Sequence, residues 1–265
     1  MNTLWIYGDS FSTDYKDEDW IWTRALAHRF AEQGLISHYK NASVAGCSND
    51  WISTQIAHDI DEWQQGDSVI VIPTEPSRQW WFDDAPELSN IISMRGSPEA
   101  KNYTQRFPER VTAVNYYYTQ IWRNTIDSMR YEQMIAWLKL HALDHSVNLV
   151  LMPAFDVPTD YKGIVHTQGS LTETVCNGEF VNDKEMSQWY STGLDTRYNH
   201  MCRRNHAVLV DKLWERFTQG TPVDLTQGFD TQFLKLKDRL THTDELGAWL
   251  IDRAKVPPKT PIGQF

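Results

Sequence analysis

Short apolar runs, many of them rich in β-branched residues, recur over the first 155 positions, and each one stops at Gly, Pro or polar residues. Runs of this kind are typical of the buried strands of a parallel sheet. They predict strands at residues 4–7, 38–46, 68–74 and 147–154. The third run, SVIVIPT, has the strongest β-character and is expected at the centre of the sheet.

Between these runs the apolar residues recur at helical spacing. This period predicts helices at residues 20–34, 49–63, 116–145, 201–217 and 244–254. Ser48 and Asn49 are both candidates for the N-cap of the second helix. Residues 75–115 have weak periodicity and predict a long loop or small subdomain inserted after the third strand, where long loops often act as lids.

The order of the elements predicts the fold class. Strands that alternate with helices form a parallel sheet with right-handed crossovers and helices on both faces. We therefore expect an α/β fold, a three-layer α/β/α sandwich around a flavodoxin-like central parallel sheet of about five strands. The main domain is expected to span residues 1–217, and residues 218–265 form a C-terminal extension with one helix.

Polar residues follow three of the predicted strands. The first strand stops at Gly8, Asp9 and Ser10, the second runs into Gly46, and the third ends at Thr74. Because the carboxyl ends of parallel strands meet at one edge, these residues are expected at the edge where open α/β sheets bind ligands. A capped turn without chemistry would use the same residue types, so the rest of the chain has to decide.

Three motifs occur in a fixed order: GDSFS at residues 8–12, NASVAGCSN at residues 41–49, and the histidine-bearing DTRYNHMCRRNHAVL at residues 195–209. In this order the chain resembles the SGNH hydrolases, also called the GDSL esterase/lipase family. The NHxxxxNH pattern within the third motif looks like the members of that family from tailed bacteriophages.

The resemblance implies a catalytic serine with a base and an acid. Ser10 would be the nucleophile and His200 the general base. The family places the acid three residues before the histidine, where this chain has Arg197, so Asp195 is the nearest acid. A second histidine, His242, has Asp238 four residues before it and is the alternative base.

The resemblance also implies an oxyanion hole made by the Ser10 N–H, the Gly46 N–H and an asparagine side chain. This chain has Thr74 at the place of the asparagine, and Asn49 or Arg78 could substitute for it. Four residues are candidates for substrate contact or for support of the catalytic groups: Asp9, Asn49, Arg78 and His206.

Charge and composition narrow the range of partners. The 265 residues carry a formal net charge of −10 without a basic stripe, which argues against binding to nucleic acid. No stretch approaches the roughly 18 apolar residues that span a bilayer, so no membrane partner is expected. Three widely spaced cysteines fit free thiols in a reducing compartment. We expect a cytoplasmic protein, or a virion-associated one if it comes from a phage.

The sequence thus favours a serine hydrolase that cleaves small acyl esters, such as O-acetyl groups on carbohydrate, with no cofactor and no metal ion. The alternative is a weak or inactive scaffold, a phage structural or interaction protein that docks a protein partner through its C-terminal extension. The missing asparagine and the displaced acid favour this alternative. A flavodoxin-like nucleotide binder would share the sheet, but the chain has no glycine-rich phosphate loop.

Overall fold

The computed structural model describes residues 2–14, 19–80, 105–155, 167–171, 201 and 203–229. The chain divides into two compact units. The first unit comprises Met1–Thr13 and Gln33–His166, and the second comprises Asp14–Glu32 and Thr167–Phe265.

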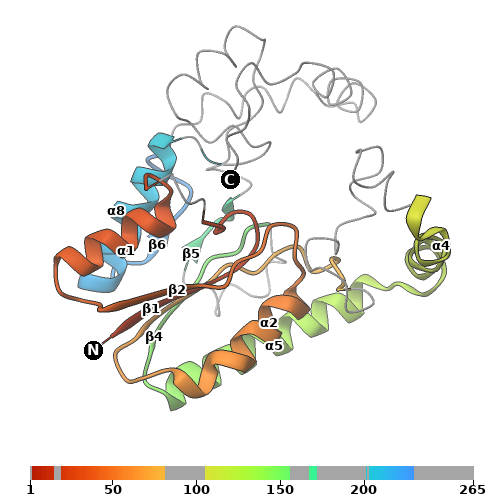
Figure 1. Ribbon diagram of the computed structural model, residues 1–265, viewed down its shortest axis with the longest axis horizontal. Helices are drawn as coiled ribbons and strands as arrows, with labels where there is room; N and C mark the ends of the chain where they lie inside the picture. Colours follow the sequence, from red (N-terminus) through yellow and green to blue (C-terminus); the bar gives the residue numbers. More distant parts are fainter. Residues whose placement is uncertain are drawn as a thin grey trace, which may run out of the picture. The chain divides into compact units, whose positions relative to one another are not determined.

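The first unit is built on a parallel sheet of four strands in the order β2-β1-β3-β4 (Figure 1). The strands are β1 (Thr3–Tyr7), β2 (His38–Asn41), β3 (Ser68–Val71) and β4 (Asn148–Leu151). The first connection runs outward from β1 to β2, and the next one crosses back over β1 to β3. The carboxyl ends of β1 and β3 therefore form the topological switch point, where sheets of this type bind ligands.

Two helices cover one face of this sheet, as Figure 1 shows. They are α2 (Asn49–Asp59), which continues into the 3₁₀ turn η1 (Ile60–Glu62), and α5 (Asn124–Asp144). Alternate strand residues pack against them in one apolar cluster that includes Trp5, Tyr7, Val69, Val71, Leu149, Leu151, Ile52, Ile56, Ile135 and Leu138. Leu4, Ile6 and Ile70, which point to the other face, are also buried. Burial on both faces explains why these strands are continuous apolar runs in the sequence.

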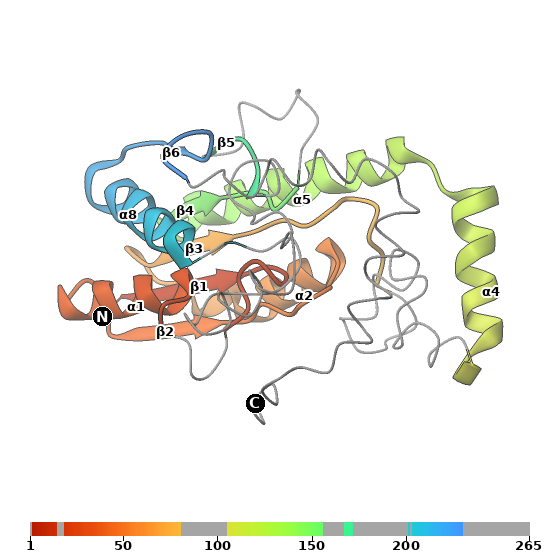
Figure 2. The same cartoon turned by 90° about the horizontal axis from the view of Figure 1, so that it is seen from above.

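The helix predicted at residues 116–145 is interrupted. A first helix, α4 (Pro108–Tyr116), passes into the π-helical turn η3 (Tyr117–Ile121), and α5 starts only after an extended residue at Arg123. Figure 2 shows that α4 and α5 run in different directions. Within the segment 75–115, predicted as a long loop or small subdomain, α4 begins at Pro108, where the missing N–H of proline costs nothing in the first turn of a helix. That this segment is an insertion stays a prediction.

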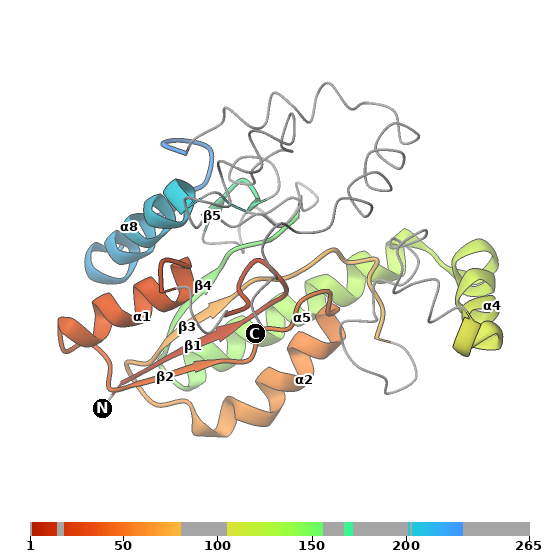
Figure 3. The same cartoon turned by 45° about the horizontal axis from the view of Figure 1, so that its top comes forward.

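The second unit contains α1 (Trp22–Glu32), α8 (Arg203–Gln219) and a short parallel pair, β5 (Thr167–Gln168) with β6 (Val223–Asp224). The two helices lie side by side (Figure 3). Phe30 of α1 makes edge-to-face contacts with Trp214 and Phe217 of α8, at centroid distances of 5.6 and 5.5 Å. Strands of two residues carry no periodic signal, and the sequence did not predict β5 and β6.

The α/β class with a central parallel sheet and helices is confirmed, consistent with a three-layer α/β/α fold. The described residues give this sheet four strands rather than about five. The domain boundary after residue 217 stays a prediction, and the helix expected at 244–254 lies outside the described residues. Within the described ranges, no helix is long and apolar enough to span a bilayer.

Candidate active site

The turn that follows β1 depends on Gly8. A Cβ at this position would overlap Ser12 Oγ and would lie 2.8 Å from the Cβ of Ile72. The Gly8 carbonyl accepts the Val44 N–H at 3.0 Å, which ties the end of β1 to the segment after β2. Only glycine lets the chain pass this close to β3, and the turn that follows carries Asp9 and Ser10.

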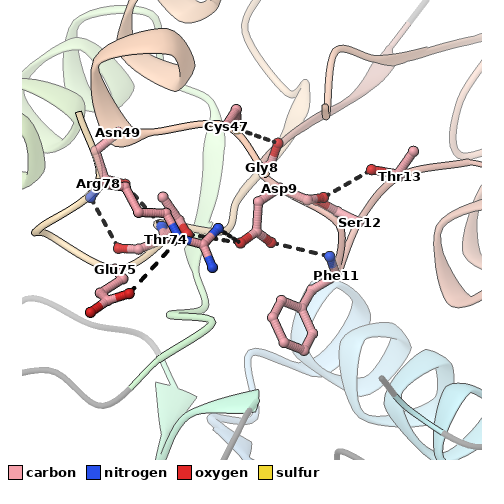
Figure 4. A network of polar contacts seen from close by, with 10 residues as sticks. All are labelled: Gly8, Asp9, Phe11, Ser12, Thr13, Cys47, Asn49, Thr74, Glu75 and Arg78. Carbon is pink, nitrogen blue, oxygen red and sulfur yellow. Dashed lines mark hydrogen bonds and ion pairs between the residues drawn. The ribbon is translucent and has the colours of Figure 1, made fainter. Parts of the chain in front are cut away.

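The Asp9 side chain is the centre of the site and is fully buried (Figure 4). One carboxylate oxygen accepts the Phe11 N–H at 3.1 Å. The other accepts the Thr74 hydroxyl at 2.8 Å and Arg78 Nη1 at 3.1 Å. The carboxylate therefore joins the turn after β1 to the segment after β3. Burying a carboxylate is unfavourable unless it is paired and hydrogen-bonded, and these contacts meet both conditions.

The Asp9 carbonyl closes the same turn. It accepts the Ser12 N–H at 3.0 Å and the Thr13 hydroxyl at 3.1 Å. Ser10, half-buried, lies within this turn at the carboxyl edge of the sheet. Its backbone is thus fixed on both sides by contacts of Asp9.

Asn49 holds the end of β3 against the start of α2. Its Oδ1 accepts the Thr74 N–H at 2.9 Å, and its Nδ2 donates to the Thr74 carbonyl at 3.0 Å. Ser48, rather than Asn49, is the N-cap of α2, because its hydroxyl accepts the Trp51 N–H at 3.3 Å. Both donors of Thr74 are therefore in use, one on Asp9 and one on Asn49.

Gly46 lies in the turn between β2 and α2 with a φ of 78°, in the left-handed region that favours glycine. Within the described part of the chain, its N–H donates to no backbone carbonyl. The next residue, Cys47, is a buried free thiol that donates to the Gly8 carbonyl at 3.4 Å. Burial raises the pKa of the Cys47 thiol, so the group stays protonated and does not act as a nucleophile.

Arg78 is held from several sides. Its guanidinium lies over the ring of Phe155, 4.8 Å from the centroid, and Phe155 meets Phe11 edge-to-face at 5.8 Å. Glu75 Oε2 is 3.9 Å from Arg78 Nε. That Nε is buried and has no hydrogen-bond partner among the described residues. Nε is thus in ion-pair range of Glu75 but makes no hydrogen bond to a described residue.

A small cavity of about 40 Å³ lies beside this network. Asn49 and Arg78 line it together with Asp50, Gln79, Asp127 and Arg130. Gln79 bridges the far wall, since its Nε2 donates to Asp127 at 3.0 Å and its Oε1 accepts Arg130 Nη1 at 3.0 Å. Burial raises the pKa of Asp50, and the nearby Arg130 partly opposes this. Sequence reasoning missed Gln79 and Asp127, because no motif connects two residues so far apart.

The structure places six of the predicted site residues in the segments that follow β1, β2 and β3, at the carboxyl edge of the first unit: Asp9, Ser10, Gly46, Asn49, Thr74 and Arg78. His200 with Asp195, and His242 with Asp238, lie outside the described residues. The identity of the base and of its acid therefore stays a prediction.

His206 belongs to the second unit, where it is buried in α8. Its Nδ1 accepts the N–H of Trp22 at 3.2 Å, and its ring meets Trp20 edge-to-face at 5.1 Å. Trp22 is the first residue of α1. His206 therefore satisfies a backbone donor at the start of that helix.

No protein-family model matches the chain, and no curated protein matches it. Among solved structures, TesA is similar with 16% identity and a TM-score of 0.32, over 60% of this chain and 64% of TesA, less than two thirds of its length. The psychrotrophic esterase EstA from Pseudoalteromonas sp. is similar with 12% identity and a TM-score of 0.31, over 95% of this chain and 100% of EstA. Likenesses this distant carry no argument about activity.

Proposed function

We propose that the chain is a serine hydrolase of the SGNH type that cleaves small acyl esters, with Ser10 as the nucleophile. The observation that carries the proposal is the turn after β1. It lies at the switch point of the sheet, where ligands bind in open α/β folds, and the buried Asp9 carboxylate fixes it to the segment after β3. A nucleophile needs such a fixed position to attack a bound ester.

The reaction would follow the acyl-enzyme route. The Ser10 hydroxyl attacks the ester carbonyl while a histidine takes its proton, and the same histidine protonates the leaving alcohol. A water molecule then attacks the acyl-serine while the histidine takes its proton, and the histidine returns a proton to the Ser10 oxygen as the acid leaves. In this proposal His200, oriented by Asp195, is the base, and His242 with Asp238 is the alternative.

The developing oxyanion needs donors that are not already engaged. The Gly46 N–H meets this condition with respect to backbone carbonyls of the described residues. Thr74, the residue at the place of the family's asparagine, uses its hydroxyl and its N–H elsewhere. Arg78 Nε makes no hydrogen bond to a described residue, although Glu75 Oε2 lies 3.9 Å from it, and it is our candidate for the third donor.

Our proposed substrate class is a small acyl ester, such as an acetyl ester on a carbohydrate. The cavity of about 40 Å³ is lined by Asn49 and Arg78 but not by Ser10 or Gly46, so its volume sets no limit on the acyl group.

A fluorophosphonate probe and two p-nitrophenyl esters test the proposal. We expect covalent capture of the probe by the wild type and no capture by the Ser10→Ala variant. We also expect kcat/KM to be higher for the acetate ester than for the octanoate ester. His200→Ala and His242→Ala are compared in the same assay, and the variant that loses hydrolysis identifies the base. Equal labelling of the wild type and Ser10→Ala would refute the role of Ser10.

A second candidate function is a non-catalytic scaffold, a phage structural or interaction protein that docks a partner through residues 218–265. The observation that favours it is the engagement of both Thr74 donors by Asp9 and Asn49. Absence of probe capture by a folded wild type at neutral pH would support this function over the esterase.

A further inference from the structure

The last turn of α5 presents three metal-binding side chains: His141, Asp144 and His145. Residues spaced by three and four positions share one face of a helix. One ligand atom from each side chain lies within 4.8 Å of the other two. The three residues are thus gathered around one point on the described surface of the first unit.

His145 is oriented as a metal ligand should be. Its Nδ1 lies 3.3 Å from the carbonyl oxygen of Trp63. A carbonyl only accepts, so the hydrogen bond assigns the proton to Nδ1 and leaves the lone pair on Nε2. Metal-bound histidines commonly donate their second ring nitrogen to a backbone carbonyl in this way, which fixes the ring and its tautomer.

His141 has unused bonding capacity. Its Nδ1 is buried and has no hydrogen-bond partner among the described residues. Its ring is held in place between Trp137, at a centroid distance of 5.1 Å, and His145, at 6.2 Å. A buried ring nitrogen without a partner is unfavourable, and an ion bound at this Nδ1 would supply the missing partner.

The electrostatic setting favours a cation. The carbonyl groups at the C-terminal end of a helix carry a partial negative charge, and α5, with 21 residues, is the longest helix of the described part. Asp144, exposed in the last turn, adds a carboxylate. A positive ion at this place would be attracted by both.

We propose that His141, Asp144 and His145 bind a divalent transition-metal ion of the zinc class. Two imidazoles and one carboxylate are a donor set suited to Zn²⁺, whereas Mg²⁺ and Ca²⁺ prefer oxygen ligands throughout. Ligand atoms on a tetrahedral ion stand roughly 3.3 Å apart, given Zn–N distances near 2.0–2.1 Å. The proposal includes a rotation of the exposed Asp144 side chain that brings its carboxylate into this range.

The site lies at the amino edge of the sheet, opposite the edge that carries Asp9. Next to it, the Ser146 carbonyl accepts the Gly66 N–H at 3.1 Å, and the Asn148 N–H donates to the Asp67 carbonyl at 2.8 Å. These bonds join the end of α5 to the start of β3. The ion therefore stabilises this junction, and its role is independent of the esterase activity proposed for the other edge.

Titration of the untagged full chain with Zn²⁺ by calorimetry tests the proposal. We expect the wild type to bind one more ion than the His141→Ala and His145→Gln variants, or to bind it at least tenfold more tightly. His38→Ala, which removes an exposed histidine from the start of β2, is the matched control and should bind as the wild type does. Subtracting the number of Zn²⁺ ions bound by the variants from the number bound by the wild type excludes zinc bound elsewhere in the chain.

Thermal unfolding provides a second readout. Zn²⁺ should raise the Tm of the wild type and of His38→Ala, and Mg²⁺ should not. Because Asp144 is exposed, Asp144→Asn is expected to keep the fold, and it should weaken Zn²⁺ binding and reduce the increase in Tm. Zn²⁺ affinity that is unchanged in both Asp144→Asn and His145→Gln, or absence of Zn²⁺ binding by the wild type, would overturn the proposal.

Discussion

Two aspartates are fully buried at opposite edges of the same sheet, and they are held in different ways. Asp67, just before β3, accepts three uncharged donors: the Thr3 N–H at 2.7 Å, Trp5 Nε1 at 2.9 Å and the Gln64 N–H at 3.0 Å. Asp9, just after β1, accepts a backbone N–H, a hydroxyl and a guanidinium.

This difference distinguishes a structural role of Asp67 from a role of Asp9 in a ligand-binding site. Around Asp67 the donors are backbone and indole groups of the strands and turns that it joins, so the contacts serve the fold. Around Asp9 the donors include Arg78, a cation with a further buried Nε that no described residue accepts from. Unused polar capacity at a ligand-binding edge indicates a place for a bound group.

Substitution of Ser10 should have the largest effect. We expect Ser10→Ala to lower kcat/KM for p-nitrophenyl acetate at least about a thousandfold, because loss of the nucleophile removes most of the catalysis of a serine hydrolase. Ser68→Ala, a change of a buried serine at the amino edge, should leave kcat/KM unchanged. Steady-state kinetics on both variants measures the contrast, and a Ser10→Ala enzyme with normal turnover would contradict it.

Neutralising each buried aspartate should separate activity from stability. Asp9→Asn leaves Arg78 without its buried anionic partner, and we expect a loss of about 3–5 kcal/mol in the free energy of unfolding. Turnover per folded molecule should also fall at least tenfold, because the Ser10 turn loses its tie to the segment after β3.

Asp67→Asn is the matched substitution at the other edge. The amide NH₂ of the asparagine faces N–H groups whose hydrogen bonds the carboxylate had accepted. We expect a loss of about 1–3 kcal/mol in the free energy of unfolding. Turnover per folded molecule should be unchanged. Urea unfolding and active-site titration together measure the pair, and equal losses of turnover in the two variants would erase the distinction.

Gly8→Ala should destabilise the carboxyl edge by sterics alone. The added methyl group meets Ser12 Oγ and Ile72 Cβ, and overpacking of this kind costs about 1–3 kcal/mol. Gly34→Ala is the control, because Gly34 has a φ of 67° and nothing lies within 4 Å of the place that an alanine Cβ would take. Its cost should be limited to backbone strain of about 1–2 kcal/mol. Thermal melts compare the two, and a smaller loss for Gly8→Ala would show that the turn can move.

A third buried aspartate tests whether a cationic partner is enough to make a site. Asp59, in α2, accepts Lys40 Nζ at 2.7 Å and His58 Nδ1 at 2.9 Å. Burial opposes ionisation, but the hydrogen bonds from His58 and Lys40 outweigh it and hold the pKa of Asp59 below its usual range.

A folded-state pKa below the unfolded value gives stability that is present above about pH 3.9 and is lost as the pH falls through the folded value. We therefore expect Asp59→Asn to be less stable than the wild type at pH 7, by on the order of 1 kcal/mol. The difference should shrink below about pH 4, with turnover unaffected. Urea unfolding from pH 2 to 7 measures this, and a constant difference across that range would contradict it.

The strands could be predicted from the sequence because burial on both faces leaves an unbroken apolar run. The interruption between α4 and α5 could not be predicted from the sequence. It is accompanied by side-chain contacts, Trp122 Nε1 to Asp127 at 2.5 Å and the Tyr118 hydroxyl to the Ser77 carbonyl at 2.5 Å. Periodicity contains no information on such contacts, so it extends the helix across the break.

The candidate site divides in the same way. Parallel topology brings the residues after β1, β2 and β3 together, and this convergence was predictable. The bonding of Thr74 was not, because the choice between Asp9 and a bound substrate depends on a rotamer. Gln79 and Asp127, whose hydrogen bond borders the cavity, had no sequence signal.

The Cys47 thiol lies beneath the backbone that leads to Ser10, against the Gly8 carbonyl. An alkylating reagent can reach this thiol only when the segment opens. The rate at which iodoacetamide modifies Cys47, measured by peptide mass spectrometry, therefore reports how often the segment opens. A ligand that binds at the carboxyl edge and holds the segment closed should lower the rate of Cys47 alkylation. Substrates can therefore be screened by this rate without measuring turnover.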